Sequence, residues 1–278
     1  MMLSTTGSAP AFAPRVISLT SGKGGVGKST LTANLALELA RAGQRVLLID
    51  GDFGMANLDV MFGLRARQSL HEVVQGEALI QDILMPVSEN ITLIPGGSGI
   101  YDLQKLTAIA KQTLLDQISQ LEESFDVVLV DTAPGITDNV LFLNSAVEEI
   151  HVVLTPDPSS LTDAYALIKT LHLKARENRF QIICNQVRDQ QDGERIFNRL
   201  ENVVARFLPV RLEMAGIIPM DPHLRQAVRS QQLVGRAQPQ SESAEAIRAL
   251  AREIVQRQRL GECKGSLQFF WRQMVGAA

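Results

Sequence analysis

Short apolar runs alternate along the chain with longer segments in which apolar residues recur every three or four positions. The runs are nearly continuous, as in Val127 to Val130, which is typical of strands buried on both faces of a parallel sheet. The longer segments have the spacing of amphipathic helices. The pattern predicts strands at 15–20, 45–50, 91–95, 126–131, 149–154, 179–185 and 213–219. It predicts helices at 29–42, 103–121, 137–146, 159–173, 193–207, 222–233 and 241–258.

This alternation predicts an α/β fold with a mainly parallel, twisted sheet and helices on both of its faces. No internal repeat is visible in the sequence, and no second apolar core is indicated. A polar loop at 238–243 precedes the last long helix, and 261–265 separates that helix from a further apolar segment. We therefore expect a short flexible tail at 1–14, one domain at 15–260 and an appended tail at 261–278.

Composition narrows the class of protein. Of the 278 residues, 45% are hydrophobic, which is enough for a large core. Two cysteines are too few for a disulfide scaffold or a four-thiolate zinc site, and they fit a reducing cytosol. The first 14 residues hold no charged residue and no long apolar stretch, so we expect no secretory signal there. No apolar run reaches the roughly 18 residues of a membrane span, and the net charge of −3 argues against wholesale nucleic-acid binding.

A glycine-rich motif, G-x-x-x-x-G-K-[ST], follows the first predicted strand and opens the first predicted helix. A phosphate-binding loop requires this placement, because glycines let the backbone turn N–H groups inward and the helix adds the positive end of its dipole. Lys28 is expected to reach the β- and γ-phosphates, Ser29 to hold Mg²⁺, and Thr30 to donate near the α-phosphate. The predicted nucleotide-binding residues of this loop are Gly22, Lys23, Gly24, Gly25, Val26, Gly27, Lys28, Ser29 and Thr30.

Aspartates follow two other apolar strands, in the segments D-G-D and D-T-A-P-G. Because ligands of open α/β sheets bind at the carboxyl ends of strands, these aspartates should gather beside the phosphate loop. Asp131 is expected to hold Mg²⁺ directly or through water, and Asp52 to orient the attacking water. Asp50 either supports the water shell of the metal or only forms a turn. Gly135 would let its loop approach and sense the γ-phosphate.

The loop sequence S-G-K-G-G-V-G-K-S-T resembles the deviant Walker A loop of the MinD/ParA group of P-loop ATPases. D-G-D-F-G-M-A-N-L-D resembles switch I of that group, and D-T-A-P-G resembles its switch II. The resemblance implies an ATPase that forms a homodimer with ATP, in which Lys23 reaches the nucleotide of the partner. It also implies a water-positioning role for Asp52 and adenine contacts for Asn185, Pro219 and Asp221. No N-K-x-D motif for guanine is present, so ATP is the expected nucleotide. With the Mg²⁺ expected at Ser29 and Asp131, the expected cofactors are ATP and Mg²⁺. The predicted catalytic residues are Lys23, Lys28 and Asp52.

Outside the nucleotide motifs the chain resembles the FlhG/FleN branch of this group. The similarity is carried by S-L-T-D-A-Y-A-L-I-K at 160–169, R-F-L at 206–208, G-I-I-P at 216–219 and L-Q-F-F at 267–270. It implies a regulator that limits flagellar number and acts with the flagellar GTPase FlhF or restrains a FleQ-type transcription activator. Many members begin with a D-Q-A-x-x-L-R helix that stimulates FlhF, and 1–14 holds no such motif, which favours the FleQ-type activator. The resemblance implies a cytoplasmic protein that associates peripherally with the membrane as the ATP-bound dimer.

The last segment carries an apolar stripe. On a helix that turns about 100° per residue, five apolar residues of 266–275 fall within an arc of roughly 140°. Such a stripe is typical of a terminal helix docked on the core, and equally of an amphipathic helix on an anionic membrane surface. Two short helices on a dimer would bind a membrane much better than one. The predicted membrane contacts are Leu267, Phe270, Trp271, Met274 and Val275.

Four other functions share parts of this pattern. A MinD-like division-site ATPase would have the same core and an amphipathic tail. A ParA-like positioning ATPase would need a basic surface, for which Arg225, Arg229 and Arg236 are candidates, although no direct nucleic-acid binding is expected. An iron–sulfur carrier would need paired cysteines at a dimer seam, whereas Cys184 lies on the adenine side and Cys263 in the tail. A pure binding switch would hold ATP without appreciable turnover.

Overall fold

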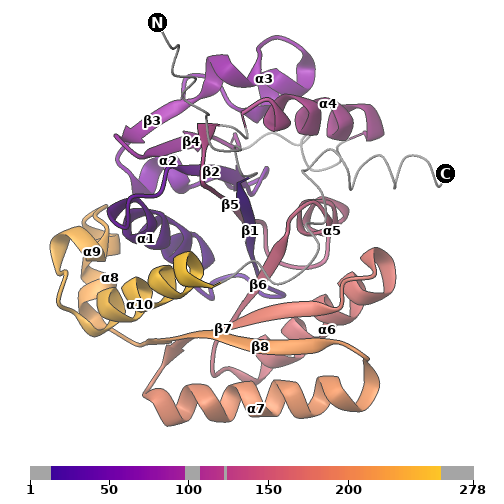
Figure 1. Cartoon of the computed structure of the whole chain (residues 1–278), viewed down its shortest axis with the longest axis vertical. Coiled ribbons are helices and arrows are strands. Elements are labelled where there is room, and N and C mark those ends of the chain that lie inside the picture. The colour runs from indigo at the N-terminus through magenta and orange to yellow at the C-terminus, as the bar shows by residue number, and fades with distance from the viewer. Residues whose placement is uncertain (1–13, 98–106, 122–123, 258–278) are drawn as a thin grey trace, which may run out of the picture.

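An eight-stranded sheet forms the centre of the protein, with its strands in the order β3-β4-β2-β5-β1-β6-β7-β8 (Figure 1). The computed structural model describes residues 14–97, 107–121 and 124–257. Neighbouring strands are parallel except β3 and β4, which pair antiparallel at one edge of the sheet. The expected α/β fold with a mainly parallel sheet is therefore confirmed.

The predicted strands are all present, with ends that shift by at most two residues. The pattern does not predict β3, because its four residues are only half-buried or exposed. The proline within it suits an edge strand. The strands are β1 Arg15–Thr20, β2 Val46–Gly51, β3 Met85–Ser88, β4 Ile91–Ile94, β5 Val127–Thr132, β6 Glu149–Leu154, β7 Arg179–Val187 and β8 Arg211–Pro219.

The longer helices also follow the prediction, with one correction. Of the helix predicted at 103–121, α4 covers Ala108–Ser119, and 103–106 lie outside the described residues. The helix expected at 222–233 is wrong beyond Arg229, because Gln231 adopts a left-handed φ of 51° in the turn that follows. The predicted tail helix at 266–275 lies outside the described residues. The helices in the described part of the chain are α1 Lys28–Arg41, α2 Leu58–Met61, α3 Leu70–Gln75, η1 (a 3₁₀ helix) Ile80–Ile83, α4 Ala108–Ser119, α5 Asp138–Ser145, α6 Pro158–Ala175, α7 Gln190–Phe207, α8 Pro222–Arg229, α9 Val234–Ala237 and α10 Glu242–Gln256.

Each face of the sheet carries its own apolar core. Along β1, Ile17 and Leu19 join the core that includes α1, α8 and α10, whereas Val16 joins the core that includes α4, α5 and α6. Successive side chains of a strand alternate between faces, so a continuously apolar strand serves both cores. Figure 1 shows α1, α8, α9 and α10 together on one side of the sheet. β1 lies between β5 and β6, and the crevice at its carboxyl end is where ligands of such sheets bind.

Candidate functional site

The loop between β1 and α1 has the backbone of a phosphate-binding loop. Gly25 and Gly27 have positive φ angles of 80° and 89°, which residues with side chains disfavour. Gly22 lies so close to α6 that an added Cβ would come within 2.1 Å of the carbonyl oxygen of Asp163. The loop therefore depends on these three glycines, and it leads directly into α1, whose first residue is Lys28.

Three aspartates surround Lys28 electrostatically. Lys28 is only 7% exposed, and burial lowers its pKa while the charges of Asp131, Asp52 and Asp50 oppose that shift. Asp50 and Asp131 are direct neighbours in the parallel register of β2 and β5. The structure thus brings together the aspartates that the sequence places at the ends of two strands. A lysine held among carboxylates at the start of α1 is positioned to neutralise phosphate oxygens in the loop.

Asp131 is fully buried beside the start of α1. Burial raises the pKa of Asp131 to about 6, while the Lys28 charge and hydrogen bonds from Ser29 and Thr32 act in the opposite direction. The Thr32 hydroxyl oxygen lies 3.3 Å from Oδ1 of Asp131. The Asp131 carboxylate and the Ser29 hydroxyl form a pair of hard oxygen donors, which suits Mg²⁺ because this ion takes few protein ligands and keeps several waters. Mg²⁺ bound there would neutralise charge on the β- and γ-phosphates.

The two aspartates that follow β2 have different surroundings. Asp50 is buried, and its carboxylate accepts the backbone N–H groups of Asp52, Asn57 and Leu58 at 3.2, 2.9 and 3.0 Å. Burial and the neighbouring Asp131 raise the pKa of Asp50 to about 7, against the effect of those hydrogen bonds. Asp52 is half-buried, and its Oδ1 accepts one loop N–H at 3.1 Å. Asp50 therefore shapes the loop, and Asp52 offers the more accessible carboxylate for holding a water molecule.

The loop that follows β5 lies against the phosphate loop. Gly135 donates its N–H to the carbonyl oxygen of Ser21 at 2.9 Å, and its φ of 94° requires glycine. A Cβ added to Gly24 would lie 3.7 Å from the ring of Pro134. The D-T-A-P-G segment is therefore in a position to respond to a ligand in the phosphate loop.

A buried polar network supports these two loops, and the sequence pattern does not predict it. Asn144 of α5 accepts a hydrogen bond from Ser18 at 2.8 Å and donates one to Thr20 at 3.1 Å. The Thr132 hydroxyl lies 3.0 Å from the Thr20 hydroxyl. The network links α5 to the ends of β1 and β5. Its only signal in the sequence is the presence of isolated polar residues within apolar strands.

Lys23 is engaged outside the phosphate loop. Its ammonium group pairs with the carboxylate of Asp157 and contacts the hydroxyl of Ser159, at the start of α6. The side chains of Lys23 and Asp157 are 40% and 45% exposed. An exposed ion pair of this kind contributes little to stability, so Lys23 can exchange Asp157 for another anion.

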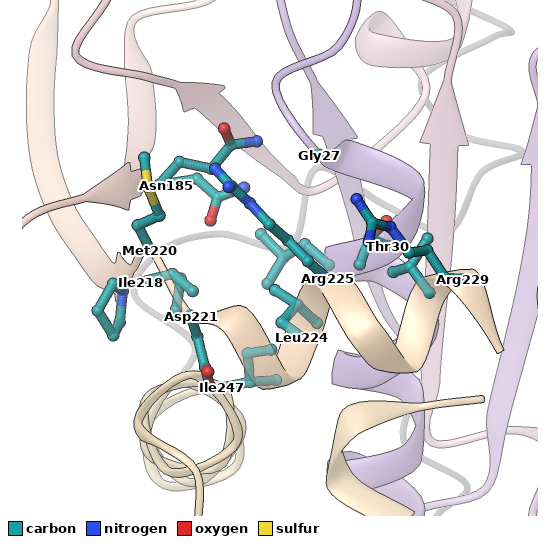
Figure 2. Close-up of a pocket in the computed structure, with 14 residues that line it drawn as sticks. Gly27, Thr30, Asn185, Ile218, Met220, Asp221, Leu224, Arg225, Arg229 and Ile247 are labelled. Atoms are coloured by element: carbon teal, nitrogen blue, oxygen red, sulfur yellow. The ribbon is translucent and has the colours of Figure 1, made fainter. Parts of the chain in front are cut away.

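A cavity of about 300 Å³ opens beside Gly27 and Thr30, at the end of the phosphate loop (Figure 2). The three residues predicted to contact adenine, Asn185, Pro219 and Asp221, all line it. Apolar side chains of α8 and α10 complete its walls. A cavity that combines apolar side chains with polar and charged groups, next to a phosphate loop, suits a base and its ribose.

Two of the three predicted adenine contacts also have structural partners. Nδ2 of Asn185 donates to the carbonyl oxygen of Val26 at 2.7 Å, so one end of its amide holds the phosphate loop. Asp221 caps α8 by accepting the His223 N–H at 2.7 Å, and it accepts both the N–H and the hydroxyl of Ser243. The carboxylate of Asp221 therefore joins α8 to α10, and a contact of Asp221 with adenine stays a prediction.

The structure separates the three arginines that the sequence offers as a basic surface. Arg225 and Arg229 line the cavity beside the phosphate loop, whereas Arg236 lines a different cavity, between α9, α2 and β3. The sequence did not indicate that the first two belong to the candidate nucleotide site. They lie on α8, whose N-cap residue is Asp221, and this proximity along the chain is the only signal.

Cys184 does not have the surroundings of a cluster ligand. It lies buried in β7, and burial raises the pKa of its thiol to about 12. A metal ligand needs the thiolate, which this environment disfavours. Cys263 lies outside the described residues.

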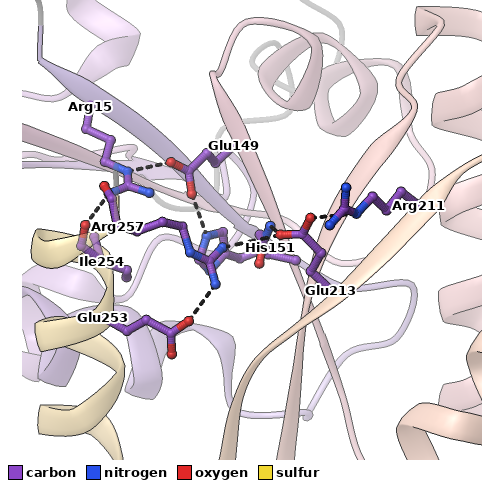
Figure 3. Close-up of polar contacts among 9 residues, drawn as sticks. Arg15, Glu149, His151, Arg211, Glu213, Glu253, Ile254 and Arg257 are labelled. Carbon is purple, nitrogen blue, oxygen red and sulfur yellow. Dashed lines mark hydrogen bonds and ion pairs between the residues drawn. The ribbon is translucent and has the colours of Figure 1, made fainter. Parts of the chain in front are cut away.

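At the amino ends of the strands, a polar cluster holds the last turn of α10 (Figure 3). The Arg15 guanidinium pairs with Glu149 and donates to the backbone oxygens of Ile254 and Arg257. Arg257 in turn pairs with Glu253 at 2.6 Å. The end of α10 is therefore fixed to β1 and β6, at the opposite end of the strands from the phosphate loop.

Replacing Glu149 by Gln should destabilise the protein by about 3 kcal/mol at pH 7. Burial alone would raise the pKa of Glu149, but hydrogen bonds and charges from His151 and Arg15 hold it at about 2, below the ordinary value of 4.5. A lowered carboxyl pKa stabilises the folded state above pH 4.5, and that contribution is lost as the pH falls towards 2. Urea unfolding should therefore show a smaller difference between the variant and the wild type at pH 3 than at pH 7.

Glu253→Gln is the control for this prediction, because Glu253 is a half-exposed partner of Arg257. We expect it to change the free energy of unfolding by less than about 0.5 kcal/mol. Equal effects of the two substitutions at both pH values would contradict the role of Glu149.

Known proteins are similar to this chain in sequence and in fold. The family described as "ParA: NUBPL iron-transfer P-loop NTPase" matches residues 13–255. The antiactivator FleN of Pseudomonas aeruginosa is 37% identical over 261 residues, covering 94% of this chain and 93% of FleN. The flagellum site-determining protein YlxH of Helicobacter pylori is 33% identical, covering 94% of this chain and 90% of YlxH. The cell division ATPase MinD of Pyrococcus furiosus has a TM-score of 0.72 at 30% identity, covering 87% of this chain and 98% of MinD.

A second solved structure, MinD of Pyrococcus horikoshii complexed with Mg-ADP, has a TM-score of 0.72 at 29% identity. The match covers 87% of this chain and 96% of the Pyrococcus horikoshii chain. These similarities extend over nearly the whole described domain and not over the phosphate loop alone. The chain therefore belongs to the MinD/ParA family of P-loop ATPases, in its FlhG/FleN branch.

Proposed function

We propose that this protein is an ATP-dependent dimerising switch of the FlhG/FleN type that limits flagellar number. The flagellar role is supported by two relatives, one named an antiactivator and the other a flagellum site-determining protein. In this proposal the protein hydrolyses ATP slowly with Mg²⁺, which Ser29 and Asp131 hold. Asp52 positions the attacking water, and Lys28 neutralises the β- and γ-phosphates.

One observation carries the proposal: Lys23 belongs to the phosphate loop, yet it pairs with the exposed carboxylate of Asp157. A cation at the edge of the site, held by exposed partners at the start of α6, is available to the nucleotide of a second copy. There it would neutralise charge that develops on the transferred phosphoryl group, as an arginine finger does. Since the Lys23 ammonium group of the second copy reaches the nucleotide only in the dimer, an isolated chain is expected to hydrolyse ATP slowly.

Exposed apolar side chains support a docking face for the second copy at this end of the sheet. Met55, in the loop after β2, is 66% exposed, and Ile136, in the loop after β5, is 50% exposed. β2 and β5 are neighbours, so both residues flank the carboxyl ends of the central strands. Burial of these side chains between two copies would favour association.

We also propose that the segment 266–275 binds an anionic membrane surface in the dimer, through the five apolar residues of its stripe. The described part of the chain holds no helix with the length and apolarity needed to span a bilayer. The FleQ-type transcription activator is the proposed main partner, and the GTPase FlhF is the second.

Light scattering with ADP and with ATP tests the switch. We expect the full chain carrying Asp52→Ala to double its mass with ATP and to remain a monomer with ADP. A monomer under both conditions would overturn the proposed dimer. Co-sedimentation of the same samples with anionic vesicles tests the tail. Trp271→Glu should prevent the ATP-bound dimer from pelleting, whereas Gln273→Glu, which adds the same charge off the apolar stripe, should not.

Replacing Asp157 by Asn should make the ATP-dependent dimer about two- to fivefold tighter. The substitution removes the charge that holds Lys23 in the isolated chain. It keeps an oxygen that can cap α6, as Asp157 does by accepting the Ser159 N–H at 3.1 Å. The mass measured against protein concentration with ATP gives the dimer affinity.

Asp189→Asn is the matched control for Asp157→Asn, because Asp189 is an exposed cap of α7 that pairs with Arg188. It should leave the dimer unchanged. If Asp157→Asn also leaves the dimer unchanged, or weakens it, the pair with Lys23 does not compete with dimer formation.

Loss of the protein from its host should give cells with extra flagella. Minicells would instead favour the MinD-like division-site function, and DNA binding that falls steeply with salt would favour the ParA-like function. Retention of the FleQ-type activator by the immobilised ATP-bound protein, but not by the ADP-bound protein, would support the proposed partner.

A further inference from the structure

We infer that Arg225 and Arg229 of α8 bind the nucleoside part of the nucleotide, with the guanidinium group of Arg225 stacked on the base. The inference rests on the proposed binding of ATP to the phosphate loop, and it extends that site to a helix outside the loop and the switch segments. It assigns to these two arginines a ligand with a flat aromatic base and negative charge.

The cavity connects the phosphate loop to α8. Gly27 and Thr30 line it from the loop, and Arg225 and Arg229 line it from the helix. Figure 2 shows Arg225 extending towards the side of the cavity where Asn185 lies, and Arg229 lying on the side of Thr30. A nucleotide whose phosphates occupy the loop and whose base enters this cavity lies beside both guanidinium groups.

The charges of these arginines are not balanced within the part of the chain that the structure describes. Both side chains are exposed, and no ion pair there joins either one to an acidic side chain. Arg41 and Arg248, in contrast, both pair with the buried Glu38. Two like charges four residues apart on one helix face disfavour the helix. A nucleotide in the cavity would offset that repulsion.

The part of β7 that lines the cavity has an unusual backbone. Gln186 lines the cavity with a φ of 57°, and the pairing of β7 with β8 is irregular between Asn185 and Val187. A left-handed conformation in a residue other than glycine is unfavourable and is found preferentially at functional sites. The cavity is therefore lined both by a polar segment of β7 with an irregular backbone and by two cationic side chains of α8.

The planar guanidinium group determines what the contact can distinguish. It stacks on the face of a purine, and every base has such a face, so stacking does not select one base over another. Lysine keeps the charge of arginine but lacks the plane. The stacking contact should thus contribute equally to the binding of ATP and of GTP, and it should be absent for a ligand without a base.

Calorimetric titration of the full chain with ATP, GTP and inorganic tripolyphosphate tests the inference. Arg225→Ala should weaken the binding of ATP and of GTP by the same factor, about fivefold, and should leave the affinity for tripolyphosphate unchanged. Arg225→Lys should weaken ATP binding as much as Arg225→Ala does. Arg229→Ala should also weaken the binding of ATP but not that of tripolyphosphate. Arg236→Ala removes the same charge from the neighbouring helix α9, outside this cavity, and should bind all three ligands as the wild type does.

Each alternative result has a distinct meaning. If the wild type binds ATP and both Arg225→Ala and Arg229→Ala bind it equally well, the inference fails and the proposed function stands. If the α8 variants bind tripolyphosphate more weakly as well as ATP, or if Arg236→Ala weakens ATP binding as they do, the arginines act only through long-range charge. Either result overturns the inference. If Arg225→Lys binds as the wild type does, stacking is excluded. If the wild type binds no ATP, the proposed function itself fails.

Discussion

Replacing Lys28 by Ala should lower the affinity for ATP at least about 100-fold and abolish hydrolysis. Lys28 is the buried cation among Asp131, Asp52 and Asp50. Without the ammonium group of Lys28, these carboxylates face the β- and γ-phosphates with no positive side chain between them. Calorimetric titration of the full chain with ATP and Mg²⁺ measures the binding, and phosphate release measures the hydrolysis.

Lys23→Ala is the matched control, because it removes an equal charge from the same loop. Lys23 pairs with Asp157 outside the loop, so this variant should keep ATP binding in the isolated chain and lose the ATP-dependent dimer. Lys28→Ala is expected to stay folded. The pKa values of Asp50 and Asp131, already raised to about 7 and about 6, let these carboxyls take up a proton near neutral pH. Unchanged ATP affinity in Lys28→Ala would contradict the role given to Lys28.

The fold is predictable wherever a segment is long and strongly patterned. Val127 to Val130, within the strand predicted at 126–131, are continuously apolar because both faces of the strand are covered, and the strand appears one residue displaced as β5. The edge strand β3 and the short helices α2 and α9 give no such pattern, since four residues are too few to show a period. The helix that ends at Arg229 is mispredicted because a left-handed Gln231 has no reliable signal in a single sequence.

The candidate site is predictable where contacts are local and not where they depend on packing. The phosphate loop lies within eight consecutive residues, and the parallel register alone brings Asp50 beside Asp131. The pair of Lys23 with Asp157, in contrast, joins residues 134 positions apart in the chain. The position of Arg225 depends on how α8 packs against the crevice, and neither arrangement follows from spacing. Both are side-chain arrangements that only the folded chain defines.

Replacing Asp52 by Ala should leave ATP binding unchanged or slightly stronger, and should lower hydrolysis at least about 100-fold. Asp52 adds negative charge near Lys28 and Asp131, so its removal does not harm phosphate binding. The loop should survive the substitution, because Asp50 still accepts its three backbone N–H groups. What is lost is the accessible carboxylate that orients water. Single-turnover hydrolysis, together with the mass of the ATP-bound species, should show a dimer that persists.

Two further variants separate the role of Asp52 from a structural one. Asp59→Ala removes a carboxylate from the same segment, where Asp59 accepts the N–H of Val60 at 2.8 Å, and it should hydrolyse ATP normally. Asp50→Ala removes the acceptor of three loop N–H groups and should weaken both ATP binding and hydrolysis. If Asp52→Ala behaves like Asp50→Ala, the carboxylate of Asp52 shapes the site. If it hydrolyses ATP at the normal rate, the water is held by another group, and the persistent dimer should not form.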